Sequence, residues 1–400
     1  MADLDAADQL AIQNVLAVEP ALRGLKLASD AVGLDRNTIL HAGPAFAKSA
    51  DITKPILNSA IVALVFEGVA NDFDSAEQMI LSGEAVLQPA QNYEVVTPLA
   101  ACVTASFMLQ EVADGAGSGR TAYTPINGGN SPGAMRLGVR TEESLGLVRW
   151  LNGDFATALS GAFGDPIPTL PVARAGMEAG DDCHGRTPAA TATLAEILAP
   201  RLAGSDGGQA AAAFVKESPS YFLNIWMASA RCMLSAASGT EGSSLVIGAG
   251  GNGAEAGIQV AGLPSRWFAA PADPPNHQMP EDIPTGRALG AIGDSAIVDA
   301  LGFGAMAMNL APEQKKGMSH LMPDGGLELP GLLLAAEHPG FGDLGLCVGT
   351  AARTVVGAGR RPIVSLGVLD NEGELGRVAG GVFETPMSIF RNAVTALEAA

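Results

Sequence analysis

The chain has 400 residues, of which 48% are hydrophobic and 16% charged, so it can build a sizeable core and leaves little for disorder. Its formal net charge of −19 argues against nucleic acid and against anionic membrane surfaces, because both require a basic footprint on the protein. A small anionic substrate remains compatible with this charge if arginine or lysine side chains gather locally.

The N-terminal segment and the cysteines indicate a compartment. The segment is acidic and lacks the apolar stretch of a signal peptide, and no apolar run approaches the ~18–20 residues of a membrane span. The four cysteines lie far apart, with no CxxC pair and no histidine at zinc spacing. We therefore expect reduced thiols in a cytoplasmic protein, without a structural zinc site.

The first 240 residues are dominated by helical patterns. The expected elements are helices at 5–18, 55–68 and 74–82, a short buried strand at 39–44, a buried strand or helix at 99–108, a loop at 115–133 and mostly helix over 142–238. The last of these helices is expected to start at Pro219 and end at Gly239. It carries a polar stripe that faces either a cleft or solvent, formed by Ser220, Asn224, Arg231 and Ser235.

After residue 239 the pattern changes to short apolar runs between glycine-rich turns, which is typical of strands. Strands are expected at 244–248, 257–261, 267–270, 332–336 and 362–366, and helices at 294–309 and 385–397. This order indicates an α+β fold, helix-rich in its first half to two-thirds and strand-rich in its C-terminal part, and not a regular doubly wound sheet. We divide the chain into an N-terminal α/β lobe at 1–140, a helical segment at 141–240 and an α+β lobe at 241–400.

Residues 181–186, Asp-Asp-Cys-His-Gly-Arg, carry the densest chemistry of the chain. The pattern predicts a helix over 172–184 that ends with Gly185 in a left-handed conformation. A second helix follows, with Thr187 as its N-cap and Pro188 at its first position. Two carboxylates in a C-terminal turn oppose the helix dipole, at about 0.3–1 kcal/mol each, which favours a functional use of the group.

A purely structural interpretation of the same residues stays open. Asp182 and Arg186 have the i,i+4 spacing of a helical ion pair. In that interpretation His184 only caps the last carbonyls of the helix.

Two nucleotide- or phosphate-binding patterns are discounted. The glycines of 248–253 follow an apolar run as in a dinucleotide-binding turn, but the next segment stops at Pro264, so an antiparallel hairpin fits as well. Residues 118–121 have the Ser-x-Arg-Thr form with which transcarbamoylases hold carbamoyl phosphate at a helix N-terminus, yet the segment after Thr121 cannot open a helix. Arg120 remains a candidate anion ligand, because its planar guanidinium matches carboxylate and phosphate.

Several segments together resemble a known family. They are residues 180–186, 222–228, 242–246, 252–257, 266–271 and 293–295, with 41–44 and 119–123. On these motifs the chain is similar to the family that includes the G subunit of oxamate carbamoyltransferase. The resemblance runs from about Leu10 to the C-terminus.

The resemblance implies an enzyme, or an enzyme subunit, that acts on a small carbamoyl or ureido carboxylate. The family activity transfers a carbamoyl group from carbamoyl phosphate to oxamate, giving oxalurate and phosphate, in purine nitrogen catabolism. It involves an acyl-CoA-synthetase-like subunit and a third subunit; a homodimer is our default assembly from base rates. Residues 88–94 depart from the family pattern by lacking histidines, which implies a different substrate or a loss of activity.

The candidate site residues have distinct expected roles. His184 or Asp182 is expected to move a proton. Arg186, with the free N–H groups of the helix starting at Pro188, is expected to bind an anion, and Arg120 the other end of the substrate. The planar NH–CO–NH2 group is assigned to Asn224, Asn252 and Glu255. Asp294 completes the candidate binding set, although an ordinary helix N-cap is the commoner role for such a residue.

Two other functions fit the sequence. An amidohydrolase of a ureido acid or cyclic imide would use the same site with water activated by a divalent metal on Asp181, Asp182, His184 and Glu255. A non-catalytic subunit would fit the altered 88–94 segment. The leading hypothesis requires no cofactor.

Overall fold

The computed structural model describes residues 4–400. The α-helices are α1 (Ala6–Leu16), α2 (Ala28–Val32), α3 (Lys54–Glu67), α4 (Phe73–Ser82), α5 (Glu142–Trp150), α6 (Ala156–Ser160), α7 (Thr169–Glu178), α8 (Pro188–Leu202), α9 (Gly208–Lys216), α10 (Tyr221–Ser235), α11 (Ala296–Leu301), α12 (Pro312–Met318), α13 (Leu329–Leu333), α14 (Ala352–Ala358) and α15 (Met387–Glu398).

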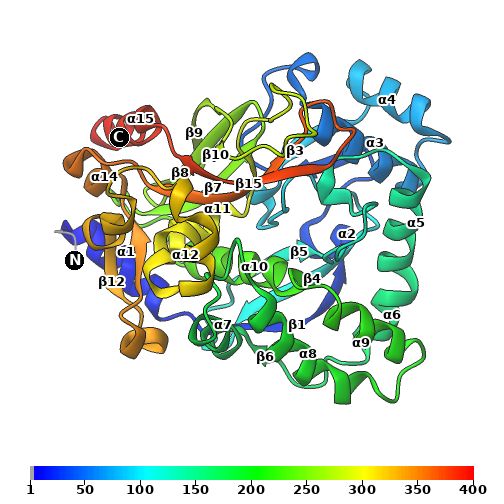
Figure 1. The fold of residues 1–400 in the computed structure, drawn as a ribbon, viewed down its shortest axis with the longest axis horizontal. Helices are drawn as coiled ribbons and strands as arrows, with labels where there is room; N and C mark the ends of the chain where they lie inside the picture. Colours follow the sequence, from blue (N-terminus) through cyan, green and yellow to red (C-terminus); the bar gives the residue numbers. More distant parts are fainter. Residues whose placement is uncertain (1–3) are drawn as a thin grey trace.

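The strands form several small sheets (Figure 1). They are β1 (Pro20–Leu27), β2 (Thr38–His41), β3 (Val86–Pro89), β4 (Met108–Asp114), β5 (Thr121–Pro125), β6 (Ile167–Pro168), β7 (Val246–Asn252), β8 (Glu255–Val260), β9 (Leu263–Pro271), β10 (Asn276–His277), β11 (Ile292–Gly293), β12 (Leu334–Glu337), β13 (Cys347–Thr350), β14 (Ile363–Leu369) and β15 (Arg377–Glu384). The sheet orders are β5-β4-β1-β6, β11-β7-β8-β9, β10-β15-β14, β2-β3 and β12-β13. The α+β class, with strands concentrated in the C-terminal part, is confirmed.

Helix α10 lies across the first sheet and is the centre of the largest hydrophobic cluster. Its aromatic residues Tyr221, Phe222 and Trp226 are fully buried. The same cluster also contains Val15 and Phe303, which lie far away in sequence. All three parts expected from the sequence thus contribute to this cluster, and the boundaries proposed for them stay a prediction.

Most of the expected early elements are present, with several corrections. Helices α1, α3 and α4 and strand β2 match the predicted segments. Strands β1, β3, β4 and β6 were not predicted. The expected loop at 115–133 contains β5, a short strand with Thr and Tyr residues that lies between glycine-rich turns. Residues 99–107 form mostly buried turns with one bridge, between Val103 and Leu40, and Met108 begins β4, so the expected buried strand or helix at 99–108 is not formed. Helix α10 begins at Tyr221, later than expected.

The C-terminal part places two sheets on either side of α11. Strands β7 and β8 form an antiparallel hairpin in which Ala249 pairs with Ile258, so the glycine-rich 248–253 segment is strand and turn and not a dinucleotide loop. The expected helix at 294–309 is interrupted, because Gly302 and Gly304 have positive φ values of 128° and 60°. A 3₁₀ segment, η5 (Gly304–Leu310), follows instead. Within residues 4–400, no helix combines the length and apolarity needed to cross a membrane.

Candidate active site

A cavity of about 340 Å³ lies where the 181–188 segment meets the start of α10, strands β14 and β15, and the 3₁₀ turn η3 (Met135–Leu137). This volume suits a small metabolite. Its chemically informative lining residues are Arg136, His184, Arg186, Asn224, Ser365 and Arg377. We call it the His184 cavity.

The 181–186 loop is built differently from the sequence prediction. Helix α7 ends at Glu178 and not at His184, and the left-handed residues are Gly180 and Cys183, with φ values of 94° and 59°, and not Gly185. A positive φ at a non-glycine residue is uncommon and costs of order 1–3 kcal/mol, and such strain concentrates at functional sites. The loop therefore holds a strained conformation beside the cavity.

Asp181 caps the next helix, which reverses the predicted electrostatics. Its Oδ2 accepts hydrogen bonds from the N–H groups of Ala189 and Ala190, at 2.8 and 3.0 Å. These groups belong to the first turn of α8, so the carboxylate lies at the positive end of a helix dipole and not at the negative end of α7. Thr187 occupies the N-cap position but donates its hydroxyl to the carbonyl of Pro219.

Asp182 organises the loop from behind the cavity. Its Oδ1 accepts from the backbone N–H groups of His184, at 3.0 Å, and Arg186, at 2.8 Å. The expected side-chain pair between Asp182 and Arg186 is not formed; the Arg186 Nε lies 3.4 Å from Asp181 Oδ1 instead. Burial raises the pKa of Asp182 to about 6, against the hydrogen bond from His184. Asp182 thus positions both neighbours without lining the cavity.

His184 is held by Asp299, a residue that the sequence analysis did not single out. The Nδ1 of His184 lies 2.5 Å from Oδ2 of Asp299, and both side chains are buried. The other carboxylate oxygen accepts from the N–H groups of Ala305 and Ser365, at 2.8 and 3.1 Å. Nδ1 is thereby engaged, and Nε2 is the nitrogen that can serve a ligand in the cavity. The prediction that His184 caps helix carbonyls is wrong.

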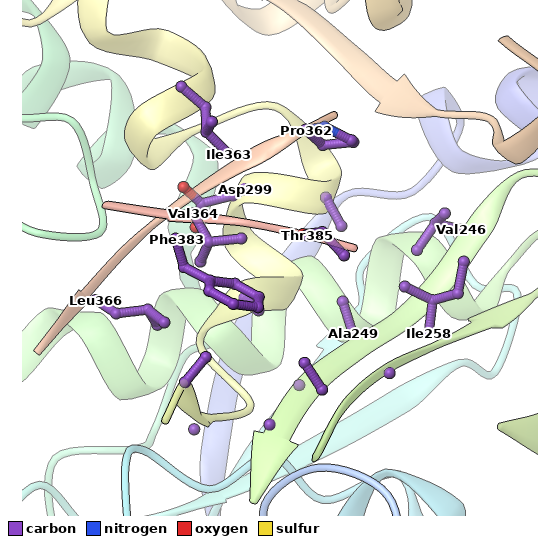
Figure 2. A pocket seen from close by; sticks show the side chains of 18 of the residues that line it. Val246, Ala249, Ile258, Asp299, Pro362, Ile363, Val364, Leu366, Phe383 and Thr385 are labelled. Atoms are coloured by element: carbon purple, nitrogen blue, oxygen red, sulfur yellow. The ribbon is translucent and has the colours of Figure 1, made fainter. Parts of the chain in front are cut away.

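The acid–base properties of this pair follow from its surroundings. Burial lowers the pKa of His184, but the negative charge and hydrogen bond of Asp299 outweigh it, so the net shift is upward. Burial raises the pKa of Asp299. Figure 2 shows why: Asp299 projects from α11 beside Val364 and Phe383, at the edge of a small apolar cavity that also contacts β7 and β8. Water has little access to the carboxylate.

The polar stripe of α10 faces the interior and not solvent. Ser220 and Asn224 line the His184 cavity. The Asn224 amide oxygen accepts from Asn127 Nδ2 at 2.9 Å, and its own Nδ2 donates to the carbonyl of Pro125 at 2.8 Å. Further along, Arg231 forms a bidentate pair with Glu94, with Nε and Nη2 at 2.7 and 2.8 Å from its carboxylate oxygens. Only the start of the stripe belongs to the site.

Four predicted binding residues lie outside the cavity lining: Arg120, Asn252, Glu255 and Asp294. Arg120 is exposed in the turn between β4 and β5. Asn252 is a structural residue of the β7–β8 turn, where its Oδ1 accepts from the N–H groups of Ala254 and Glu255, at 3.0 and 2.8 Å. Glu255 begins β8 at that turn. The sequence motif around them therefore marks a hairpin.

Asp294 is buried, and it is not the N-cap of α11, a position that Ser295 occupies. Its two oxygens accept from Gly43 N at 2.9 Å, Gln91 Nε2 at 2.6 Å and Thr97 N at 2.9 Å. Burial raises its pKa to about 6, although these hydrogen bonds oppose the shift. Asp294 ties the 88–94 segment and the 41–44 turn to the second sheet.

The part of the chain that the structure describes contains no assembled ligand set for the divalent metal of the amidohydrolase hypothesis. Within residues 4–400, no group of three or more His, Cys, Asp or Glu side chains is arranged to hold a metal ion. Glu255 belongs to the β7–β8 hairpin, whereas Asp181 binds the start of α8. The four residues that the amidohydrolase hypothesis requires are therefore not assembled as one ligand group in the described residues.

Two cavity arginines were missed from the sequence. Arg136 lies on η3 and Arg377 begins β15, and neither has a recognisable motif around it. Both residues line the cavity together with Arg186. Only the tertiary structure brings these three arginines, which are far apart in sequence, to one cavity.

Comparison with known proteins supports the resemblance. Residues 86–295 match the family model described as oxamate carbamoyltransferase subunit AllG. The chain belongs to this family. It is 28% identical to oxamate carbamoyltransferase subunit AllG of Escherichia coli, over 98% of this chain and 97% of that protein.

Two further proteins are similar over nearly the whole chain. An uncharacterized protein of Escherichia coli, YahG, is 29% identical over 97% of this chain and 85% of its own length. The crystal structure of a conserved protein of unknown function from Enterococcus faecalis superposes with a TM-score of 0.90 at 24% identity, covering 98% of this chain and 97% of that one. The latter similarity shows that the fold is shared.

Proposed function

We propose that this chain is a subunit of an enzyme of the oxamate carbamoyltransferase type and that its His184 cavity binds a small carbamoyl or ureido carboxylate. The observation that carries the proposal is the His184–Asp299 pair at a cavity lined by three arginines. An acidic protein needs such a local cationic cluster to hold an anionic substrate. The relative named AllG supports the reaction class.

The chemistry assigned to the site is transfer of the carbamoyl group from phosphate to the oxamate nitrogen. That nitrogen attacks the carbamoyl carbon, the bond from this carbon to the phosphate oxygen breaks, and the nitrogen loses a proton. In the proposal, Nε2 of His184 accepts this proton while Asp299 stabilises the resulting imidazolium. Arg186 binds the carboxylate, and Asp182 fixes the loop that carries both residues.

The altered 88–94 segment does not count against this role. Gln91 hydrogen-bonds to Asp294 and Ala249, and Glu94 pairs with Arg231. None of these residues lines the His184 cavity. A departure from the family pattern in this segment therefore changes the packing behind the site and leaves its cavity lining as it is. Partner subunits, a cytoplasmic location and a homodimer remain part of the proposal.

The test compares His184→Ala and Arg186→Ala with the exposed control Arg120→Ala, each assembled with the partner subunits. Phosphate release from carbamoyl phosphate in the presence of oxamate is the readout. The histidine change is expected to lower kcat by at least about a hundredfold, and the arginine change to raise KM more than it lowers kcat. Unchanged turnover and KM in both variants would show that the chemistry occurs elsewhere in the complex.

A further inference from the structure

Arg136 and Arg377 face the same cavity without an acidic partner. In residues 4–400, no carboxylate lies within 4.0 Å of either guanidinium, although the chain has 42 acidic and only 23 basic residues. Arg186 differs, because Asp181 lies beside it. The two arginines thus bring positive charge that the protein itself does not neutralise.

The position of Arg136 lowers the stability of the fold. Its Nη1 is buried and has no hydrogen-bond partner in the described part of the chain. Burial, with a contribution from the charge of Arg377, lowers the pKa of Arg136 to about 10. Arg136 is half-buried, and its unpaired buried Nη1 lowers the stability of the fold, so a residue of this kind needs a reason other than stability.

The guanidinium of Arg377 lies against two glycines. Gly367 of β14 and Gly380 of β15 are direct partners in the sheet, and both line the cavity. A Cβ atom at Gly380 would lie 3.2 Å from Nη2 of Arg377, and one at Gly367 would lie 3.3 Å from its Nε. The Nε also donates to the carbonyl of Ala379 at 3.0 Å. The guanidinium of the exposed Arg377 therefore lies against the two glycines, and its terminal nitrogens form no hydrogen bond with the described part of the chain.

Arg377 stands in electrostatic reach of both Arg136 and His184. Its positive charge lowers the pKa of each of these groups. The cavity therefore contains two guanidinium groups without an acidic partner, of which Arg377 lies close enough to His184 to affect its pKa. Arg186 follows His184 directly in the chain and provides a separate cationic group.

We propose that Arg136 and Arg377 form a subsite for a doubly charged phosphoryl group of an acyl phosphate, adjacent to His184. Two guanidinium groups supply two positive charges and several N–H donors, which match a tetrahedral dianion better than a carboxylate. In this assignment Arg186 binds the carboxylate of the second substrate. This assignment rests on the proposed function for the identity of the cavity, but its test does not require turnover.

The test measures binding of inorganic phosphate by calorimetry and by the shift in Tm, on the full-length chain and on its complex with the partner subunits. The variants are Arg136→Met and Arg377→Met, with the exposed Arg120→Met as matched control. Each cavity variant is expected to weaken phosphate binding by about ten- to a hundredfold, the usual effect of losing a charged hydrogen bond. Arg120→Met is expected to bind as the unchanged protein does.

Stability separates a binding role from a structural one. Without ligand, Arg136→Met is expected to keep or raise Tm, because a half-buried, unpaired charge is replaced by an apolar side chain. Gly380→Ala offers an independent route, since it displaces the Arg377 guanidinium without removing it; it is expected to weaken phosphate binding as well. A lower Tm of Arg136→Met together with an unchanged affinity for phosphate would overturn the proposal.

The two proposals fail in distinguishable ways. If the unchanged protein does not bind phosphate at millimolar concentration, yet His184→Ala abolishes turnover, the phosphoryl subsite is wrong and the proposed function stands. If phosphate binding depends on Arg136 and Arg377 while His184→Ala leaves turnover intact, the subsite stands and the catalytic role of the cavity is wrong. Oxamate is expected to bind independently of Arg136→Met and to weaken in Arg186→Met.

Discussion

Nδ1 of His184 lies 2.5 Å from Oδ2 of Asp299, a residue 115 positions further along the chain. The backbone N–H groups of Ala305 and Ser365 hold the other carboxylate oxygen, so the carboxylate has one orientation. A histidine fixed at Nδ1 presents Nε2 to its surroundings. The site residue found in the sequence therefore depends on a partner that only the fold provides.

Asp299→Asn is expected to lower turnover by about a hundredfold while the protein stays folded. The asparagine Oδ1 can keep the bonds from Ala305 and Ser365, but its NH2 group then faces Nδ1 and forces the proton onto Nε2. The pKa of His184 is raised in the unchanged protein because Asp299 outweighs burial. The variant loses that charge, so the rise of activity with pH is expected to shift to lower pH.

The measurement is a pH–rate profile of the assembled enzyme, with the exposed Asp282→Asn as control. A purely structural role for Asp299 would lower the rate without moving the profile. An unshifted midpoint would therefore contradict the assigned function of the pair.

Asp181→Ala is expected to destabilise the protein by about 1–3 kcal/mol, because the N–H groups of Ala189 and Ala190 lose their acceptor. Asp181→Asn retains an acceptor oxygen and is expected to cost less. Urea unfolding of the two variants checks this difference. Equal losses in both would indicate that the charge beside Arg186, and not the helix cap, is what the residue provides.

Gly43→Ala is expected to cost more than about 3 kcal/mol or to prevent folding, since buried backbone cannot move aside. Gly43 has a φ of 76°, and a Cβ there would lie 2.4 Å from the backbone carbon of Gly251. Gly33 is a matched control, with a φ of 66° and nothing within 4 Å of its added Cβ. Gly33→Ala is expected to lose only about 1 kcal/mol, the cost of the left-handed conformation itself.

Similar losses for the two alanine variants in urea unfolding would show that φ alone matters at Gly43. In that case the close approach between the 41–44 turn and β7 would not explain why glycine stands there.

His338→Asn is expected to reduce the loss of stability on acidification. Burial lowers the pKa of His338 to about 4, so its contribution to stability is present above pH 6.5 and is lost as the pH falls toward 4. The loss amounts to about 2 kcal/mol between pH 7.5 and 5. Asparagine can keep the acceptor that His338 Nδ1 offers to Gly340 N–H.

The measurement compares the unfolding free energies of the variant and of the unchanged protein at both pH values. Asp182 and Asp294 have raised pKa values and therefore stabilise the protein as the pH falls, but this contribution is the same in both proteins and cancels in the difference. A difference in unfolding free energy that does not change with pH would contradict a buried neutral histidine at position 338.

Sequence patterns were sufficient to predict those helices whose start and end are determined by neighbouring residues. Helices α3 and α4 were found because their apolar periodicity ends at glycines that adopt positive φ, Gly68 and Gly83. The concentration of ionisable side chains in 181–186 was also evident from the sequence. Strand β5 was missed because a five-residue strand between glycine-rich turns has no periodicity to detect.

Long-range contacts decided the rest of the site. The sequence identified His184 and Arg186 by residue type, but Asp299, Arg136 and Arg377 have no local signal, since each acquires its role from a neighbour far away in the chain. The same reason explains Asp181, which reads as a poorly placed charge at the end of one helix and is in fact the cap of the next. Composition, periodicity and turn chemistry act over a few residues, so the sequence by itself determined the fold class and the segment that carries the candidate site residues. Burial and pairing act between distant segments. The partners of the cavity residues and the charge of the cavity were therefore decided only by the tertiary structure.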